Sequence, residues 1–392
     1  MLSLESVLLA LTVLSAAYWL CAIGGAAAFG RRRPAGRGWT PPISVLKPLL
    51  GADGQLYGNL RSFCDQHYPA YEVLFGVQDE QDPAVPVVNR LLEEFPHLDL
   101  RLVVDGRAIG PNRKMGNVAN LGRAAKHSIL VVADSDMRVG RDYLRAVVAP
   151  LEDVSVGMVT CLYRSAPRRG LGSRLAAMFV NEWFFPAALL GARVQPLRHA
   201  FGATIACRRG PIAAIGGFEA VADYLADDYM LGFLVAQQGL RVELSPYVVE
   251  SAGGERDLAG LFFRELRWTR TFRTVRPLSY FLSGITHGIP LSVLLLLSSG
   301  FSDLALAMTA VHLGLRGGGG IVVYSALRLP VPRGRLWLVP LRDSVSFMTW
   351  ILSFLGQSVR WNGRRLRVDP SGRLHPLTEA ASPLRHPSSR PG

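Results

Sequence analysis

The sequence predicts an α/β domain with a mostly parallel sheet, flanked by transmembrane helices near both ends of the chain. In the middle of the chain, short apolar runs alternate with helical segments, which is typical of a parallel sheet with covered faces. Near the ends, residues 6–29 contain no Asp, Glu, Lys, Arg or His, and residues 277–302 contain only His287. Hydrophobic residues make up 49% of the chain, and the excess is concentrated in these two runs.

The first apolar run is expected to be a membrane anchor over residues 1–30. Residues 3–29 exceed the roughly 20 apolar residues that a spanning helix needs. A cleaved signal peptide is disfavoured because no basic segment precedes the run and Arg31–Arg33 follow it. Because Lys and Arg mark the cytoplasmic flank of a span, the domain expected over residues 40–255 should be cytoplasmic.

The pattern of apolar residues predicts the strands and helices of this domain. Strands are expected at 43–49, 72–78, 100–104 and 128–133, and helices at 56–67, 84–95, 114–126 and 229–237. A loop rich in Gly, Pro and Asn covers 106–113. Ligands of such sheets bind beyond the carboxyl ends of the strands, where Asp79 and Asp134 lie.

A mostly apolar segment at 171–194 has two interpretations. Arg174 and Glu182 disfavour a buried span. It is either a helix on the membrane surface or part of the protein core, and the sequence leaves both open.

The C-terminal part should return to the membrane. We expect an amphipathic interfacial segment at 256–280, a transmembrane region at 281–360 and a disordered tail at 361–392. The candidate spans are 281–301, 303–327 and 336–358. Charged residues interrupt two of them and must be paired or reach the interface: Arg316, Arg342 and Asp343. Three spans would place the tail outside, whereas its arginines favour the inside, so the number of spans stays open.

The net charge of +13 favours a membrane rather than a nucleic acid as partner. Arginines cluster beside the apolar stretches, at 31–33, 264–276 and 360–367. This placement suits anionic lipid headgroups. The four cysteines form no C-x-x-C pair, so the sequence indicates neither a zinc site nor a disulfide framework.

Acidic residues at strand ends indicate a site for a diphosphate and a cation. Asp134-Ser135-Asp136 directly follows an apolar strand. Carboxylates and phosphates repel each other, so a bridging Mg²⁺ or Mn²⁺ would hold them together. Asp79 could bind a uracil or ribose, and Asp82 is expected to cap the helix that begins near Pro83.

Three further features of the sequence are candidates for substrate binding or catalysis. Lys114 opens a helix near this site and could contact the base or a phosphate. Asp228 follows Asp227 at a helix start, where one carboxylate can cap the helix and the other can act as a general base. Arg264 and Arg267 share a helix face and could bind a departing diphosphate, with Trp268 packing over a sugar.

The set D…D-S-D…D-D-Y…R-x-x-R-W, in this order, resembles the ceramide glucosyltransferase family, and among its members the bacterial hopanoid-biosynthesis-associated glycosyltransferases. The matching stretches cover about residues 5–360 and include Leu46-Lys47-Pro48-Leu49, Phe75-Gly76-Val77-Gln78-Asp79, Asn112-Arg113-Lys114, Leu225-Ala226-Asp227-Asp228-Tyr229 and Glu265-Leu266-Arg267-Trp268. The resemblance implies a GT-A fold. It also implies that Lys47, Asp79, Lys114 and Asp134 bind a UDP-sugar, that Asp134 and Asp136 hold the metal, and that Asp228, Arg264, Arg267 and Trp268 are catalytic.

The resemblance further implies an inverting transferase in the bacterial inner membrane, facing the cytoplasm. The favoured reaction moves N-acetylglucosamine from UDP to a hopanoid polyol such as bacteriohopanetetrol; the alternative moves glucose to ceramide. Two departures disfavour ceramide: Asp227 stands where ceramide-directed relatives tend to have Glu, and D-S-D replaces their D-S-G. A processive polysaccharide synthase usually has Q-x-x-R-W and more spans. A non-enzymatic scaffold is disfavoured by the intact carboxylates.

Overall fold

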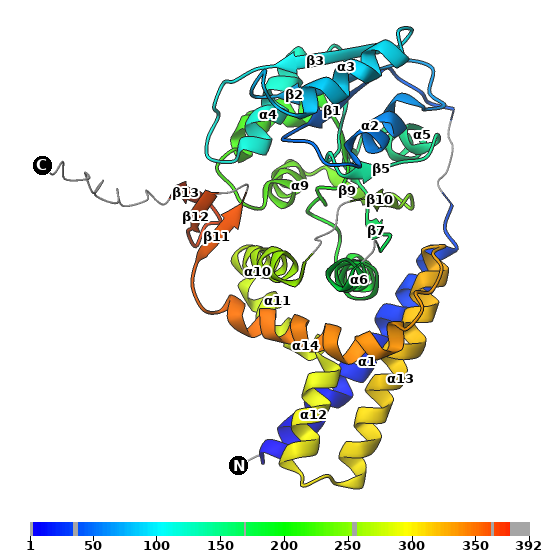
Figure 1. Cartoon of the computed structure of the whole chain (residues 1–392), viewed down its shortest axis with the longest axis vertical. Coiled ribbons are helices and arrows are strands. Elements are labelled where there is room, and N and C mark those ends of the chain that lie inside the picture. Colours follow the sequence, from blue (N-terminus) through cyan, green and yellow to red (C-terminus); the bar gives the residue numbers. More distant parts are fainter. Residues whose placement is uncertain (1–2, 34–37, 168–169, 253–256, 362–363, 377–392) are drawn as a thin grey trace, which may run out of the picture.

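The computed structural model describes residues 3–33, 38–167, 170–252, 257–361 and 364–376. An α/β domain lies above a set of helices, from which a narrower helical bundle projects (Figure 1). The expected arrangement of a central domain between apolar helices is therefore confirmed.

A seven-stranded, mostly parallel sheet forms the centre of the domain, in the order β3-β2-β1-β4-β8-β6-β9. The strands are β1 (Ile43–Pro48), β2 (Tyr71–Val77), β3 (Asp99–Val104), β4 (Ile129–Val132), β6 (Val156–Thr160), β8 (Ile205–Arg208) and β9 (Arg241–Leu244). Strand β8 runs antiparallel to its neighbours β4 and β6, whereas the other pairs are parallel. The four strands expected between residues 43 and 133 are all present.

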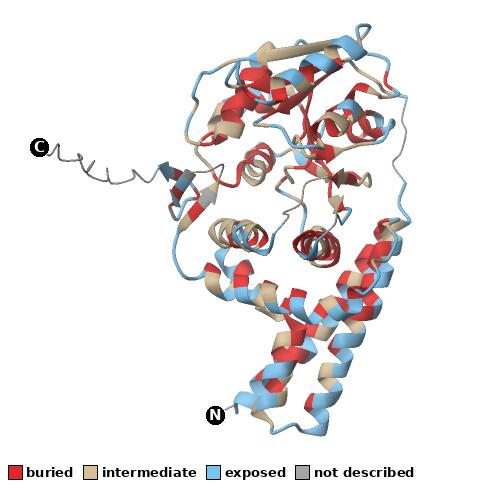
Figure 2. Ribbon diagram, viewed as in Figure 1, coloured by how far each residue is buried: buried red, intermediate tan, exposed pale blue. Residues whose placement is uncertain are grey.

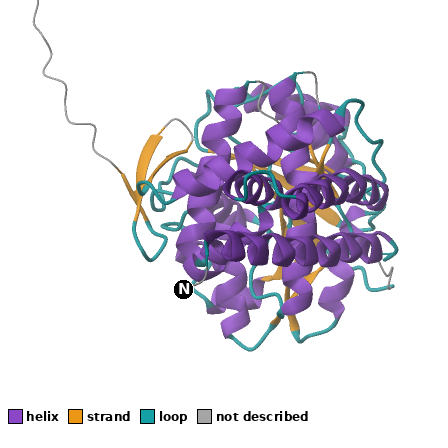
Figure 3. Ribbon diagram, turned by 90° about the horizontal axis from the view of Figure 1, so that it is seen from below, coloured by secondary structure: helices purple, strands orange, loops and turns teal. Residues whose placement is uncertain are grey.

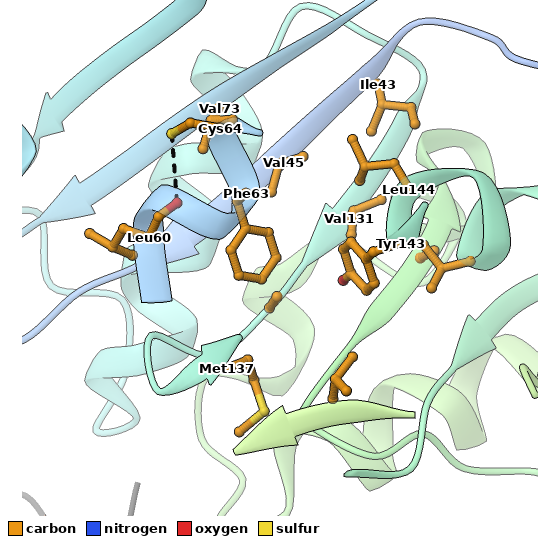
Figure 4. Close-up of a cluster of buried hydrophobic side chains, with 14 of the residues drawn as sticks. Ile43, Val45, Leu60, Phe63, Cys64, Val73, Val131, Met137, Tyr143 and Leu144 are labelled. Carbon is orange, nitrogen blue, oxygen red and sulfur yellow. Dashed lines mark hydrogen bonds between the residues drawn. The ribbon is translucent and has the colours of Figure 1, made fainter. Parts of the chain in front are cut away.

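Helices cover both faces because alternate side chains of each strand point to opposite sides. Val45 and Val131 pack with Phe63 and Tyr143 on one face, which Figure 4 shows in close-up. Leu46 belongs to the core of the other face. The helices of the first face are α2 (Leu56–Cys64), α3 (Ala84–Glu94) and α5 (Tyr143–Val148); those of the second are α4 (Arg113–Ala124), α8 (Arg209–Ala214) and α9 (Asp227–Gln237).

The projecting bundle contains α1 (Leu4–Gly30), α12 (Gly288–Ser298) and α13 (Asp303–Ala326). Much of the bundle is exposed (Figure 2), and its exposed residues include large apolar ones such as Leu20, Leu297 and Ile321. Helices α1 and α13 are long and apolar enough to cross a membrane. The chain is therefore a membrane protein by the composition of its helices.

The span expected at 281–301 is not one straight helix. Residues Pro277–Thr286, which include α11 (Pro277–Leu282), meet α12 at an angle of 64°. This bend keeps α11 beside α10 (Leu258–Val275), and α12 continues into the bundle (Figure 1).

The span expected at 336–358 is wrong as a straight membrane crossing. Its residues form α14 (Arg335–Ser353), which lies across the top of the bundle (Figure 1) and is not among the candidate spans of the described chain. The physical reason is its charge, because Arg335, Arg342 and Asp343 are buried against partners on other helices.

The three buried ion pairs satisfy the expectation that charges near the bilayer are paired. Arg316 of α13 binds Asp343 at 2.8 and 2.9 Å. Arg335 binds Glu182 at 2.6 and 2.7 Å, and Arg342 binds Glu265. Each pair joins α14 to a different segment of the chain: to α13, to the residues around Glu182 and to those around Glu265. Helix α14 is therefore fixed to three segments at once.

The segment at 171–194 lies between the domain and the bundle. It forms α6 (Leu171–Met178), a π-helical turn (Phe179–Phe184) and α7 (Phe185–Val194). Its composition would allow a membrane crossing, but 67% of its most apolar window is buried inside the protein. The neighbouring α10 (Leu258–Val275) runs alongside α6 at the same level (Figure 1).

The expectation of a disordered tail at 361–392 is wrong for residues 364–376. Strands β11 (Ser358–Trp361), β12 (Arg364–Val368) and β13 (Leu374–Pro376) form an antiparallel sheet beside the main body (Figure 3). Val359, Leu366, Val368 and Leu374 bury their side chains with Leu225, and this apolar core explains the order. Residues 377–392 lie outside the described part. A further small sheet joins β5 (Met137–Arg138), β7 (Tyr163–Ser165) and β10 (Val249–Ser251).

Candidate active site

A cavity of about 520 Å³ lies between the carboxyl ends of the central strands and helices α6 and α10. Most of the sequence-predicted site residues line it: Lys114, Asp134, Asp136, Asp228, Arg264, Arg267 and Trp268. Residues separated by more than a hundred positions in the sequence therefore meet in one place.

Lys114 forms an ion pair with Asp134, the first carboxylate of the Asp134-Ser135-Asp136 turn. Asn112 accepts a hydrogen bond from the Met115 amide at 3.0 Å and so starts helix α4, which aims Lys114 into the cavity. The Lys114 Nζ lies 2.7 Å from Asp134 and 3.9 Å from Asp227. Burial alone would lower the pKa of Lys114, but these carboxylates raise it, so the side chain remains a cation.

Lys47 lies beneath the site, outside the lining of the cavity. Its Nζ donates to the Asp134 carbonyl at 2.6 Å and sits 3.8 Å above the Phe63 ring. Burial lowers the pKa of Lys47 to about 7. In this structure its contact is therefore with the turn that carries Asp134, rather than with the open cavity.

Asp136 is a half-buried carboxylate that lines the cavity beside Asp134. Its Oδ2 accepts a hydrogen bond from Ser251 at 3.2 Å. Burial and the neighbouring Asp134 raise the pKa of Asp136 to about 6. The described residues contain no cluster of three or more His, Cys, Asp or Glu side chains suited to a metal. Two carboxylates nevertheless fit a divalent cation that takes its other ligands from a diphosphate and water.

Asp228 stands in the first turn of α9 and faces the same cavity. Its Oδ2 accepts from the Gly202 amide at 2.7 Å, and its Oδ1 accepts from the Tyr229 amide at 2.8 Å. Burial, and then the charge of Asp227, raise the pKa of Asp228 to about 6. A Cβ atom at Gly202 would lie 3.2 Å from Asp228, so glycine permits this close approach.

Asp227 faces away from solvent and is held in place. It accepts from Asn112 Nδ2 at 3.3 Å and from the Asp228 amide at 2.8 Å. Asp227 and Asp228 both line the cavity and both accept hydrogen bonds from backbone amides at the helix start, so the geometry does not separate a capping carboxylate from a general base.

Helix α10 brings the last motif to the opposite wall. The Arg264 guanidinium lies 5.1 Å from the Trp268 ring centre, and Trp268 stacks on Phe179 of the π-helical turn at 5.7 Å. Arg267 lies 5.8 Å from the ring of Trp361 in β11. Burial, and then the charge of Arg264, lower the pKa of Arg267, so an anion between the two arginines would relieve their repulsion.

Asp79, like Lys47, is a predicted site residue that does not line the cavity. It is exposed at the end of β2 and accepts a hydrogen bond from the Gln81 amide at 2.9 Å. Gln78 and Arg113 line the cavity at this edge instead and are hydrogen-bonded at 3.0 Å. Asp82 accepts from the Ala84 amide at 2.8 Å, as expected for a residue at the start of α3.

Sequence reasoning missed several lining residues, including Tyr163, Ser251 and Trp361. Tyr163 and Ser251 belong to short strands with no distinctive pattern. Trp361 was placed at the start of the disordered tail, although an isolated Trp in a polar, basic segment is a signal of a packed or binding site.

The chain matches the sequence model of Glycosyl transferase family 21 over residues 7–374. The chain belongs to this family. It is 22% identical to ceramide glucosyltransferase 1 of Caenorhabditis elegans over 343 residues, which cover 85% of this chain and 73% of that protein.

Other relatives in this glycosyltransferase family match over shorter stretches. Ceramide glucosyltransferase 3 of C. elegans is 26% identical over 59% of this chain and 50% of its own length. The ceramide glucosyltransferase of Komagataella phaffii is 33% identical over 25% of this chain and 20% of its own.

A solved structure supports the fold. It is a mannosyltransferase from Pyrobaculum calidifontis in complex with GDP-mannose and Mn²⁺, with a TM-score of 0.54 and 18% identity. The match covers 90% of this chain and 99% of that one. The expected GT-A fold is therefore confirmed.

Proposed function

We propose that this glycosyltransferase moves a sugar from a UDP-sugar to the hydroxyl of a membrane lipid, with inversion at the anomeric carbon. The observation that carries the proposal is the single cavity that gathers Asp228, the Asp134–Asp136 turn and Arg267. It offers a half-buried carboxylate as base, a pair of carboxylates for a cation and a half-buried arginine in one cavity.

The donor diphosphate is assigned to the side of the cavity formed by Asp134, Asp136 and Lys114. A divalent cation, Mg²⁺ or Mn²⁺, held by Asp134 and Asp136 would neutralise the diphosphate and stabilise UDP as it leaves. Lys114 adds a fixed positive charge, and Arg264 and Arg267 offer further donors from α10. Lys47 supports this side by holding the Asp134 carbonyl, and Asp79 is retained as a candidate for the uridine.

Asp228 is assigned the role of general base. Its two backbone hydrogen bonds fix the carboxylate, and a pKa raised to about 6 leaves it ionised at neutral pH yet more basic than an ordinary aspartate. It would accept the proton of the lipid hydroxyl as the oxygen attacks the anomeric carbon. Trp268, stacked on Phe179, provides a flat surface for the sugar.

The topology is part of the proposal. Arg31–Arg33 would flank α1 on the cytoplasmic side. If the bent pair Pro277–Thr286 and Gly288–Ser298 crosses outward and α13 crosses back, α14 and the C-terminal sheet return to the side of the catalytic domain. Two C-terminal crossings thus agree with the basic tail, and we assign the protein to a bacterial inner membrane with its site on the cytoplasmic face.

The favoured acceptor is a hopanoid polyol, with N-acetylglucosamine as the sugar, and ceramide with glucose is the second candidate. The departures at Asp227 and Asp136 from the ceramide-directed pattern favour the first, whereas the named relatives favour the second.

Mass spectrometry of lipid products tests this function. Purified protein is offered several UDP-sugars with either bacteriohopanetetrol or ceramide. The expected product is one lipid carrying a single sugar, and the acceptor that gains mass decides between the candidates. Products that carry long sugar chains would instead indicate a processive synthase, and no product from any pair would contradict the proposal.

A further inference from the structure

The C-terminal sheet is joined to the loop that precedes the proposed base. Leu225 donates from its amide to the Gly372 carbonyl at 3.0 Å, and the Leu374 amide donates to the Asp223 carbonyl at 2.7 Å. Between these bonds, Tyr224 and Arg373 form an isolated antiparallel bridge. The buried core of the sheet includes Leu225, which lies three residues before Asp228.

The same sheet is also joined to α10. Arg270 donates from Nη2 to the Leu355 carbonyl at 2.7 Å and from Nη1 to the Ser358 carbonyl. Arg273 donates to the Gly356 carbonyl at 3.0 Å. Because Arg270 and Arg273 follow Arg267 at intervals of three, one face of α10 binds both the cavity and the start of β11.

Trp361 is the residue that this arrangement brings to the cavity. It is half-buried, lines the cavity, and its ring lies 5.8 Å from the Arg267 guanidinium. It also packs against the core that contains Leu225. The sheet thus contacts both the segment leading to Asp228 and the helix carrying Arg267. Trp361 is the residue of this sheet that lines the cavity.

We propose that Trp361 contacts the hydroxyl-bearing head of the acceptor lipid and thereby helps to select it. This inference rests on the proposed function, because it assumes that Asp228 receives the acceptor proton. Trp361 packs against the cluster that contains Leu225, which precedes Asp228 by three residues, and so belongs to the side of the cavity formed by the segment that leads to the base. The Asp134–Asp136 turn, assigned to the donor, belongs to the strand-end side. A Trp ring presents a large rigid apolar face with a polar N–H edge, which suits a hydroxylated carbon skeleton.

The kinetics of Trp361→Ala test the inference. Truncating a central aromatic contact is expected to raise the KM for the acceptor by about 10-fold. The KM for the UDP-sugar should rise by less than the acceptor KM, because Trp361 contacts the donor-binding groups only through Arg267, and Asp134, Asp136 and Lys114 keep their places. Trp361→Phe should recover most of the acceptor affinity, since it keeps an aromatic face.

Trp337→Ala is the matched control. Trp337 lies on α14, is 88% exposed and lies outside the cavity lining, so its loss should leave both KM values unchanged. An unchanged acceptor KM in Trp361→Ala would overturn the inference, as would equal increases in both KM values. If the unsubstituted protein transfers no sugar to lipid, the proposed function itself fails.

A second measurement does not depend on the variant folding. A photoreactive acceptor analogue is bound to the unsubstituted protein and the labelled peptides are identified. Labelling of the peptide that contains Ser358–Trp361, reduced by excess natural acceptor, supports the inference. Specific labelling confined to other peptides would contradict it.

Discussion

Arg342 of α14 donates from Nη1 to Oε1 of Glu265 at 2.8 Å, and a second bond joins Nη2 to Oε2. Glu265 stands between Arg264 and Arg267 in α10, and both partners are fully buried. Arg342 also donates to the Leu175 carbonyl of α6 at 3.3 Å. One side chain therefore ties α14 to the two helices that flank the cavity.

Removing one partner of this pair should destabilise the protein strongly. Arg342→Met leaves the Glu265 carboxylate buried without its counter-charge, which typically costs about 3–5 kcal/mol. Adding Glu265→Gln to Arg342→Met should recover part of the loss, because it removes the unpaired charge. Thermal unfolding of the purified protein in detergent measures both effects.

Lys126→Met is the control for this experiment. The ion pair of Lys126 with Asp99 lies at the surface, and the Lys126 side chain is 52% exposed. Solvent screens such a pair, so its loss should leave the unfolding temperature nearly unchanged. Equal shifts in Arg342→Met and Lys126→Met would show that the Arg342–Glu265 pair has no special role.

Asp228→Asn should abolish most turnover while leaving donor binding intact. A positioned general base typically contributes about 10²–10⁴-fold to the rate, and the amide cannot accept the proton. The rate of sugar transfer and the affinity for UDP, measured on the same preparation, test this. Asp142→Asn, at an exposed position outside the cavity lining, should behave as the unsubstituted protein. Comparable turnover in Asp228→Asn would remove Asp228 from the role.

The pH dependence of the reaction should report the ionisation of Asp228. Its pKa is raised to about 6, and only the ionised form can accept a proton, so kcat/KM should fall as the pH drops through about 6. The residual rate of Asp228→Asn should lack this acid limb. An acid limb that persists unchanged in Asp228→Asn would assign it to another group.

The same raised pKa has a consequence for stability. The folded protein binds the Asp228 proton more tightly than the unfolded chain does, so this group destabilises the fold above about pH 6 and less so below it. Asp228→Asn should therefore raise the unfolding temperature at pH 7, and the gain should shrink toward pH 4. A variant that is less stable than the unsubstituted protein at pH 7 would contradict this expectation.

Removing divalent cations should stop the reaction. A chelator is expected to abolish sugar transfer, and Mn²⁺ or Mg²⁺ should restore it, because Asp134 and Asp136 would otherwise face the diphosphate without a bridging charge. Asp136→Asn should need a higher metal concentration for the same rate. Full activity in the chelator would exclude this role for the pair.

Much of the fold could be predicted because its signals are local. The apolar runs of β1 and β4 and the polar ends that follow them, such as Asp134, are read directly from the sequence. The π-helical turn and the bend before α12 could not be predicted in this way, since both depend on tertiary contacts. Helix α14 was misassigned because hydropathy records its apolar residues, whereas the partners of Arg342 and Asp343 lie far away in the sequence.

The candidate site shows the same division. Asp228, Arg264 and Arg267 belong to patterned motifs, and the structure brings them to one cavity. Trp361 could not be placed, because its position depends on a small sheet whose core includes Leu225, more than a hundred residues earlier. Asp79 shows the converse, since its strand-end position was predicted but its side chain points outside the cavity lining.

The most direct measurement is calorimetric titration of UDP into the purified protein, with Mn²⁺ and with a chelator. The account predicts binding in Mn²⁺, weak or no binding in the chelator, and loss of the metal-dependent part in Asp136→Asn. A protein that binds no UDP under either condition would contradict the assignment of this cavity to a uridine nucleotide.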